Sequence, residues 1–172
     1  MKKSSSESKI VISEIMLPNQ ANVAGNIHGG EIMKLMDSAA YAAARKYAKS
    51  NVVTARVDEL VFHLPIFVGN LVTCTAQVVF VGKSSIEVAV TVEVEDLECD
   101  GCQCRKKALS AFFTMVSLDK KGKPNLAPEL ILDTSEEIAA FEDGKQRHED
   151  YKVKKNKKLN DVSNNSSCKI QK

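Results

Sequence analysis

Apolar residues recur with a regular spacing between residues 30 and 48. Nearly every residue in this run is a good helix former, and no proline interrupts it. We therefore expect a long helix that is buried on most of its circumference and ends near residue 50. Its apolar residues fall close to helical spacing: Ile32, Met33, Leu35, Met36, Ala39, Ala40, Ala43 and Ala44.

Segments rich in valine, threonine and phenylalanine follow this helix. They span about 52–62, 70–81, 84–96 and 106–118, and turn residues separate them. Residues 86–95 alternate between apolar and polar side chains, which is typical of a strand with one buried face. Gly82, Lys83 and Ser84 suggest a tight hairpin between two of the strands. A further short strand is expected over 10–17.

One alanine-rich helix followed by several long strands indicates an α+β fold, in which an antiparallel sheet wraps around the helix. Small alanine side chains let the sheet approach the helix closely. A helix with so little side-chain bulk fills a core poorly by itself, so we expect a dimer to close it.

The two ends of the chain differ from this domain, which we place at 10–130. Residues 1–9 are polar and serine-rich, and we expect them to be disordered. Thr134 and Glu137 have the spacing of a capping box, which predicts a C-terminal helix within 131–152 that Gly144 weakens. Residues 153–172 are rich in lysine and asparagine, and we expect a disordered basic tail.

Composition and charge argue against several classes of function. The net charge of +2 in 172 residues gives no indication of nucleic-acid binding, and aromatic platforms for bases are lacking. Residues 145–172 carry nine lysines and arginines against three acidic residues, and a solvated tail is favoured over a tail that contacts polyanions or acidic membranes. No apolar run approaches the roughly 20 residues that span a bilayer, and the N-terminus is too polar for a signal peptide. We expect a cytoplasmic protein without membrane insertion.

The five cysteines are odd in number and clustered, which argues against a disulfide framework. Cys99, Cys102 and Cys104 have spacing that would suit a zinc ion. A fourth ligand is missing from the cluster, because His28 and His63 lie in other segments. We therefore expect reduced thiols and no metal.

Asp37 is the one carboxylate inside the apolar pattern of the helix. It lies roughly 10 Å along the helix axis from Gly30, on the same face, and is too deep to be an N-cap. Apolar surroundings disfavour a charged carboxylate, which tunes a general base toward neutral pH. The helix start at His28, Gly29 and Gly30 offers unpaired N–H groups that would stabilise an oxygen gaining negative charge. The spacing fits an acyl-transfer site, but also a glycine loop with Asp37 paired to a core arginine or lysine.

Several motifs in the same order resemble the hot-dog-fold acyl-CoA thioesterases, and most closely the cytosolic acyl-CoA hydrolase family. They are ANVAGNIHGG at 21–30, LMDSAAYAAA at 35–44, ARVDELVFHLPIFVGN at 55–70, VGKSSIEVAVTVEVED at 81–96 and SAFFTMVSLD at 110–119. The resemblance covers about residues 10–130. One departure is Asn70, where related sequences often have aspartate after the glycine.

The resemblance implies a role for each matching residue. Asp37 would act as general base or nucleophile, and Asn22 would position the water or the thioester. The N–H groups of Gly29 and Gly30 would polarise the thioester carbonyl, and His28 would orient the loop or donate to that carbonyl. The resemblance also implies that the asparagine and the aspartate of one site come from two protomers.

Contacts to the coenzyme A portion need cations and hydroxyl or N–H donors, because that portion carries phosphates. Asn26 is a secondary candidate in the motif loop, where ordinary loop hydrogen bonding is the alternative. Lys83 is alternatively an exposed hairpin lysine, and Arg56 alternatively pairs with Asp58 on the same strand face. The candidate contacts are Asn26, Arg56, Lys83, Ser84 and Ser85.

The leading functional hypothesis is hydrolysis of acyl-CoA thioesters to free fatty acid and coenzyme A, without a metal or redox cofactor. A single copy of the motif implies self-association, and the nearest relatives suggest a homodimer assembled into a trimer of dimers. A hot-dog dehydratase is a weaker alternative, because that chemistry pairs a histidine and a carboxylate differently. A non-catalytic acyl-CoA-binding sensor is the alternative from another class, although the aspartate at position 37 argues against an inactive pocket.

Overall fold

The computed structural model describes residues 2–99 and 104–167. Its strands are β1 (Lys2–Ser4), β2 (Ile10–Ile15), β3 (Asn51–Phe62), β4 (Leu71–Val81), β5 (Ser85–Glu95), β6 (Arg105–Leu118) and β7 (Glu129–Ile131). Its helices are α1 (Gly29–Ala48) and α2 (Ser135–Ser167), with short 3₁₀ turns η1 (Ser6–Ser8) and η2 (Pro18–Gln20).

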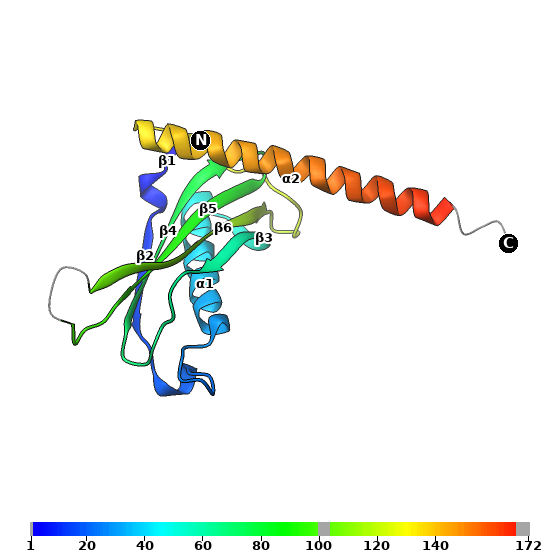
Figure 1. Cartoon of the computed structure of the whole chain (residues 1–172). Coiled ribbons are helices and arrows are strands. Elements are labelled where there is room, and N and C mark those ends of the chain that lie inside the picture. Colours follow the sequence, from blue (N-terminus) through cyan, green and yellow to red (C-terminus); the bar gives the residue numbers. More distant parts are fainter. Residues whose placement is uncertain (1, 100–103, 168–172) are drawn as a thin grey trace.

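A five-stranded antiparallel sheet in the order β2-β4-β5-β6-β3 wraps around α1 (Figure 1). Four alanines of α1 are fully buried against the sheet: Ala39, Ala40, Ala43 and Ala44. The absence of bulk on this helix face allows the close approach that the sequence predicted. The α+β fold and the central helix are thus confirmed, and the helix begins one residue earlier than expected.

Two β-bulges change which face of the sheet certain side chains occupy. In β3 the register shifts between Thr54, which pairs with buried Met115, and Arg56, which pairs with Thr114. A bulge adds one residue to a strand, so the alternation of side chains changes phase beyond it. Thr54 therefore faces α1, whereas Arg56 lies on the outer face of the sheet. A second shift in β4 places Phe80 on the outer face in the same way.

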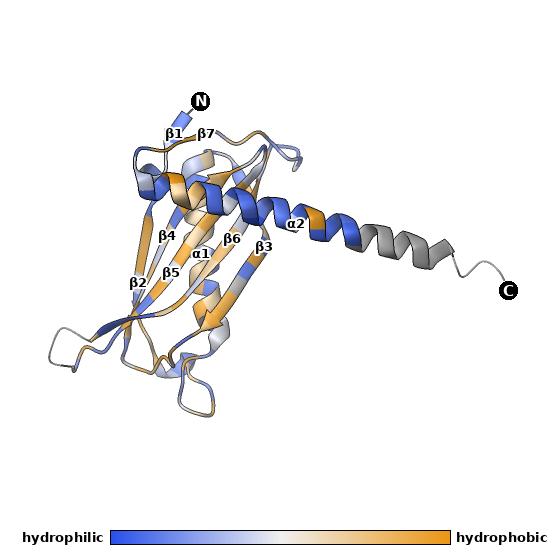
Figure 2. Cartoon of the chain, turned by 45° about the horizontal axis from the view of Figure 1, so that its top comes forward, coloured by the Kyte–Doolittle hydropathy of each residue, from blue (hydrophilic) through white to orange (hydrophobic). Residues whose placement is uncertain are grey.

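The helix α2 crosses this outer face, opposite to α1 (Figure 2). It approaches the sheet most closely at Gly144, where an added Cβ would lie 2.5 Å from the Cβ of Phe80. Phe141 packs on Phe80 with ring centroids 5.1 Å apart. One turn further along, Arg147 forms an ion pair with Glu87 at 2.5 Å, and the Glu87 side chain is only 2% exposed. Gly144, expected to weaken the helix, is thus the point of closest contact between helix and sheet.

The expectation that residues 1–9 are disordered is wrong for residues 2–9. The hydroxyl of Ser5 donates to the Val78 carbonyl at 2.6 Å, and the Val78 N–H donates to the Ser8 hydroxyl at 2.9 Å. These serines pair backbone groups of β4 just beyond the end of its pairing with β2. The Lys3 ammonium donates to the carbonyl of Tyr47 in the last turn of α1, and β1 pairs in parallel with β7. Serine therefore serves here as a backbone hydrogen-bonding partner.

The expectation of a disordered tail from residue 153 is also wrong for residues 153–167, because α2 continues to Ser167. No glycine or proline follows Gly144 in the helix, and lysine is a good helix former. At its start the Glu137 N–H donates to the Thr134 hydroxyl at 3.2 Å, while the Glu137 carboxylate accepts from the Asp133 N–H at 2.8 Å. The predicted capping pair is thus present, with its second bond shifted by one residue.

Cys99 and Cys104 form a disulfide, which corrects the expectation of reduced thiols. The hairpin explains the pairing, because Glu95 lies opposite Arg105 and the chain ends of the connection meet with the cysteine Cα atoms 5.7 Å apart. Cys102 lies outside the described residues. Within the described ranges no group of three or more potential metal ligands occurs, and no helix is long and apolar enough to cross a membrane.

Candidate functional site

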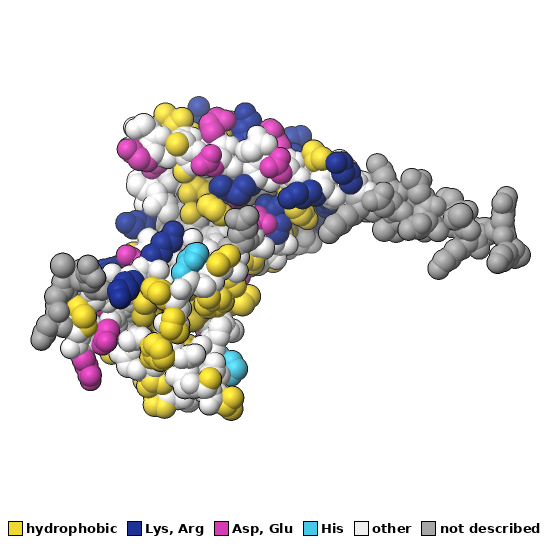
Figure 3. Space-filling model, viewed as in Figure 1, with side chains coloured by type: hydrophobic (Ala, Val, Ile, Leu, Met, Phe, Trp, Pro, Cys, Tyr) yellow, Lys and Arg dark blue, Asp and Glu magenta, His cyan; other side chains and the backbone are white. Residues whose placement is uncertain are grey.

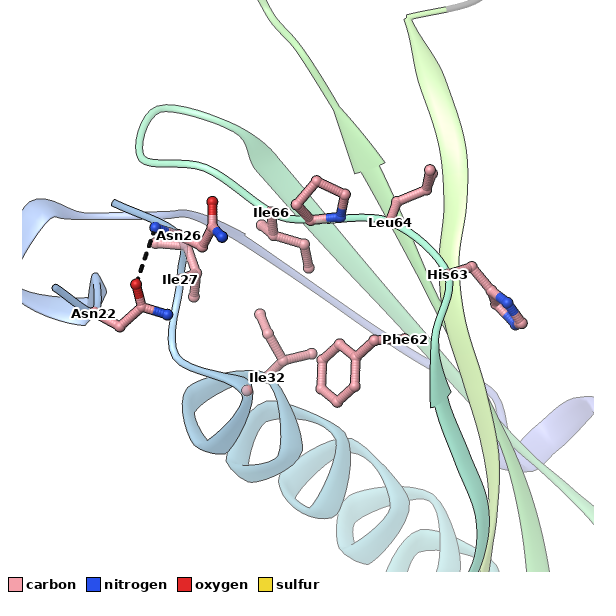
Figure 4. A pocket seen from close by; sticks show the side chains of 10 residues that line it. Asn22, Asn26, Ile27, Ile32, Phe62, His63, Leu64 and Ile66 are labelled. Carbon is pink, nitrogen blue, oxygen red and sulfur yellow. Dashed lines mark hydrogen bonds between the residues drawn. The ribbon is translucent and has the colours of Figure 1, made fainter. Parts of the chain in front are cut away.

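A cavity of about 370 Å³ opens between the start of α1 and the connection from β3 to β4 (Figure 4). Its wall is mainly apolar, and the Phe62 ring points toward Ile32. Asn22, Asn26 and Gly29 supply its polar edge. An apolar cleft with a few polar groups at one side is the usual form of a small-molecule site.

Gly29 allows an aromatic ring to lie against the first turn of α1. A Cβ at this position would come within 3.2 Å of Phe62 Cζ, so a larger residue would require the ring to shift by a few tenths of an ångström. His28 precedes the helix with an extended backbone, and its carbonyl accepts from the Glu31 N–H at 2.9 Å. The first N–H groups of a helix have no partner within it, so Gly29 places such a donor at the cavity edge. Gly30 is exposed and does not line this cavity.

Asn22 organises the motif loop by hydrogen bonds. Its side-chain Oδ1 accepts from the Ala24 N–H at 2.9 Å. It also accepts from the Asn26 N–H at 3.3 Å, the bond marked in Figure 4. Its own N–H donates to the Asn26 carbonyl at 2.7 Å, and Gly25 takes a left-handed conformation with φ +84°. With Oδ1 engaged, the two donors on Nδ2 are what Asn22 can offer a ligand. The loop-bonding role considered for Asn26 is thus filled by the side chain of Asn22.

Asp37 is held by Thr54, which was not among the predicted site residues. The Thr54 hydroxyl donates to Asp37 Oδ1 at 2.7 Å, from β3 to the middle of α1. Asp37 is half-buried, less enclosed than its apolar neighbours in sequence suggested, and it does not line the cavity beside Asn22. Among the described lysines and arginines none forms an ion pair with it, so the core-ion-pair alternative is wrong for this part of the chain. The signal for Thr54 was a hydroxyl residue directly after Val52 and Val53 in the strand that follows the helix.

The hairpin between β4 and β5 forms as predicted. The Gly82 N–H donates to the Ser85 carbonyl at 2.8 Å. The Lys83 carbonyl accepts from Ala127, and the Ser84 carbonyl accepts from Ser117, so this turn is tied to the rest of the domain. Lys83 is exposed. The roles of these residues in coenzyme A binding stay predictions.

Arg56 does not join the residues around Asp37, because the bulge in β3 directs it to the outer face. As expected from their spacing, Arg56 and Asp58 share one face and form an ion pair at 2.7 Å. The Arg56 guanidinium lies 4.0 Å from the Tyr151 ring centroid of α2. The structure therefore separates the predicted residues into an inner group around α1 and an outer group under α2.

Comparisons with known proteins are consistent over most of the chain. The model of the thioesterase superfamily matches residues 24–99. The cytosolic acyl coenzyme A thioester hydrolase of Mus musculus is 40% identical over 80% of this chain, which spans only 36% of that relative's length. The acyl-CoA thioester hydrolase YciA of Escherichia coli is 34% identical, with 69% of this chain and 90% of the relative covered.

Solved structures give the same result. An acyl-CoA hydrolase from Staphylococcus aureus, in complex with butyryl coenzyme A, coenzyme A and coenzyme A disulfide, has a TM-score of 0.84 and 29% identity, covering 96% of this chain and 99% of that one. Three variants of that enzyme, each with one asparagine, aspartate or threonine replaced by alanine, have TM-scores of 0.83 to 0.85. A hexameric acyl-CoA thioesterase has a TM-score of 0.83 and 31% identity, covering 89% of this chain and 96% of its own.

Proposed function

Because the chain belongs to the thioesterase superfamily, we propose that it hydrolyses acyl-CoA thioesters to a free fatty acid and coenzyme A. The names of its relatives support this substrate class. The chain spans only 36% of the length of the Mus musculus relative. The observation that carries the proposal is the hydrogen bond from Thr54 to Asp37 on a helix that begins with two glycines.

The spacing of three residues supports this choice. Asn22, Asp37 and Thr54 are separated by 15 and 17 positions. The asparagine, aspartate and threonine replaced in the Staphylococcus aureus variants are separated by the same 15 and 17 positions in that enzyme. We therefore treat these three residues as one functional group.

The Asp37 carboxylate has one oxygen fixed by Thr54 and a second oxygen for chemistry. As general base, it would take a proton from a water molecule while the water oxygen attacks the thioester carbon. The carbonyl oxygen then gains negative charge, which the N–H groups of Gly29 and Gly30 would stabilise, each such donor being worth roughly 3 kcal/mol. The C–S bond breaks, the sulfur receives the proton, and the products are a carboxylic acid and a thiol.

As nucleophile, Asp37 would instead attack the thioester carbon itself and form a mixed anhydride, which water then hydrolyses. Each route consumes one water and needs no metal or redox cofactor. A single turnover in ¹⁸O water tests the nucleophilic route, since ¹⁸O enters the Asp37 carboxylate only when water attacks the aspartyl carbonyl of the anhydride.

A second copy of the chain would complete the site. Asp37 does not line the cavity that Asn22 and Gly29 line, so one protomer does not bring the parts together. The strand β3 lies at the edge of the sheet and exposes Val53, Val57 and Val61. An exposed apolar edge strand is suited to association with another chain. We place the dimer contact on this edge, and the hexameric neighbour supports a trimer of dimers.

Several finer assignments belong to the same proposal. Asn26, Lys83, Ser84 and Ser85 would contact the coenzyme A portion, and His28 would orient the motif loop. The cytosolic relatives support a cytoplasmic location.

The test compares release of coenzyme A from butyryl-, octanoyl- and palmitoyl-CoA, measured by chromatography because the protein has thiols of its own. We expect Asp37→Asn to lower kcat at least about 10³-fold, equal to about 4 kcal/mol of barrier. Asn22→Ala should lower kcat/KM strongly, and Ser38→Ala, on the exposed side of α1 next to Asp37, should leave both constants unchanged. If the parent binds acyl-CoA in calorimetry but hydrolyses none, the proposal is replaced by a non-catalytic sensor.

A further inference from the structure

A second cavity, of about 450 Å³, lies on the outer face of the sheet beneath α2. The sheet contributes Arg56, Asp58 and Phe112, and the helix contributes Arg147, Tyr151 and Lys154. This cavity is on the opposite side of the sheet from Asp37. On the face seen in Figure 3, lysine and arginine side chains are interspersed with acidic side chains along α2.

Both arginines of this cavity are held rigidly. The Arg147 guanidinium lies 3.7 Å from the centroid of the Phe112 ring, and its Nε and Nη2 donate to Glu87 Oε1 at 2.9 and 2.5 Å. The Arg56 guanidinium lies against the Tyr151 ring and pairs with Asp58. Stacked and paired guanidinium groups keep one orientation, so their remaining N–H groups are aimed in fixed directions.

One donor in this arrangement is unsatisfied. The Nε of Arg56 is buried and has no hydrogen-bond partner among the residues that the structure describes. A buried donor without a partner is unfavourable, and in native proteins such a group commonly indicates a bound water or ion. Arg56 is itself mostly enclosed, with its side chain 14% exposed.

The charges around the cavity favour an anion of limited charge. Its lining has three cations, Arg56, Arg147 and Lys154, against Asp58 and Asp150. The Asp150 carboxylate also accepts a hydrogen bond from Gln146 at 2.9 Å. Glu87 beneath the cavity is paired with Arg147 and balances the remaining positive charge, so the site suits a ligand of low charge such as a single phosphate group and does not suit a triphosphate.

We propose that this cavity binds one phosphate group, with Arg56 as its main donor, Lys154 as a second cation and Arg147 as a fixed partner. Guanidinium groups match the oxygen geometry of phosphate and form short charge-assisted hydrogen bonds with it. The phosphate belongs either to a separate phosphorylated molecule or to coenzyme A, and only the second case rests on the proposed function. In both cases α2 supplies half of a ligand site that the sheet alone does not form.

The first test is calorimetric titration of the full chain with inorganic phosphate. We expect Arg56→Gln to raise Kd about tenfold or more and Lys154→Gln to raise it about threefold. Lys157→Gln is the matched control, since Lys157 is exposed on the same helix and does not line the cavity. Because Lys154 is exposed, we expect Lys154→Gln to fold normally, even if Arg56→Gln disturbs the fold. Absence of binding at millimolar phosphate, or equal Kd values for all four proteins, would overturn the proposal.

A second test separates the two sources of phosphate, with acyl-CoA and an acyl-pantetheine thioester that lacks phosphate as substrates. If the phosphate belongs to coenzyme A, Lys154→Gln raises KM for acyl-CoA only, and inorganic phosphate competes with acyl-CoA. If it belongs to another molecule, both substrates react as with the parent while phosphate binding is still weakened. Should neither thioester be hydrolysed, the proposed function fails, and the calorimetry still decides the phosphate site.

Discussion

The two helices cover opposite faces of the same sheet in different ways. Helix α1 contacts it along a continuous row of small buried side chains, and nothing but the apolar pattern is needed to place it. Helix α2 is mostly polar and is attached through a glycine against Phe80 and the buried ion pair of Arg147 with Glu87. The packing of α1 is distributed over many small side chains, whereas that of α2 is concentrated in a few contacts around Gly144 and Arg147. Changes under α2 should therefore affect stability, and changes beside α1 should affect chemistry.

The largest effect on stability is expected for Gly144→Ala. In a free helix this change would stabilise by about 1 kcal/mol, since alanine is the better helix former. Here the new Cβ would lie 2.5 Å from Phe80 Cβ, so we expect a loss of about 2–3 kcal/mol in the free energy of unfolding. Urea unfolding at fixed protein concentration measures it, with Asp143→Ala at the exposed neighbouring position as control. A stabilised Gly144→Ala variant would mean that α2 does not approach the sheet here.

Removal of Arg147 tests the second attachment. Burial raises the pKa of Glu87, and the hydrogen bonds and charge of Arg147 oppose that rise. In Arg147→Ala the carboxylate is left buried without its partner, so we expect a loss of about 2 kcal/mol near neutral pH.

The pH dependence follows from the sign of that shift. The folded protein binds a proton at Glu87 more readily than the unfolded chain, so stability falls as pH rises from the ordinary glutamate pKa to the raised one. Without Arg147 this window extends to higher pH, and unfolding curves at several pH values should record a larger total loss. The double variant with Glu87→Gln should recover stability, because no buried charge remains; failure to recover would assign the loss to packing on Phe112.

The same contrast explains what could be predicted from the sequence. Strand ends of the main sheet agree with prediction within one residue or two, because alternating side chains and turn residues mark them. The bulge between Thr54 and Arg56 leaves no such mark, so the two residues could not be assigned to opposite faces. Ser5 and Ser8 look like disordered chain until the backbone groups of Val78 that they satisfy are known. Local periodicity thus allows the strands to be predicted from the sequence, whereas contacts between distant segments cannot be predicted from it.

Beside α1, Thr54→Val should lower activity and leave stability nearly unchanged. The Thr54 hydroxyl orients the Asp37 carboxylate through this hydrogen bond, so we expect kcat to fall about 10- to 100-fold, equal to about 1.4–2.7 kcal/mol of barrier. Thr54→Ser keeps the hydroxyl and should restore most of the rate. Equal losses in both variants would show that Thr54 acts through packing in β3.

The smallest effect concerns acyl chain length. The Phe62 ring lies between Gly29 and Ile32 in the inner cavity, so Phe62→Ala would open space there. Each additional buried methylene is worth about 0.8 kcal/mol, so the ratio of kcat/KM for palmitoyl- over butyryl-CoA should rise about 3- to 10-fold. Phe67→Ala is the matched control, since Phe67 is half exposed in the same loop and does not line this cavity. If the palmitoyl-to-butyryl ratio of kcat/KM does not change, the acyl chain lies outside this cavity, against the second copy of the chain. The inner face of one protomer would then supply only the reacting groups.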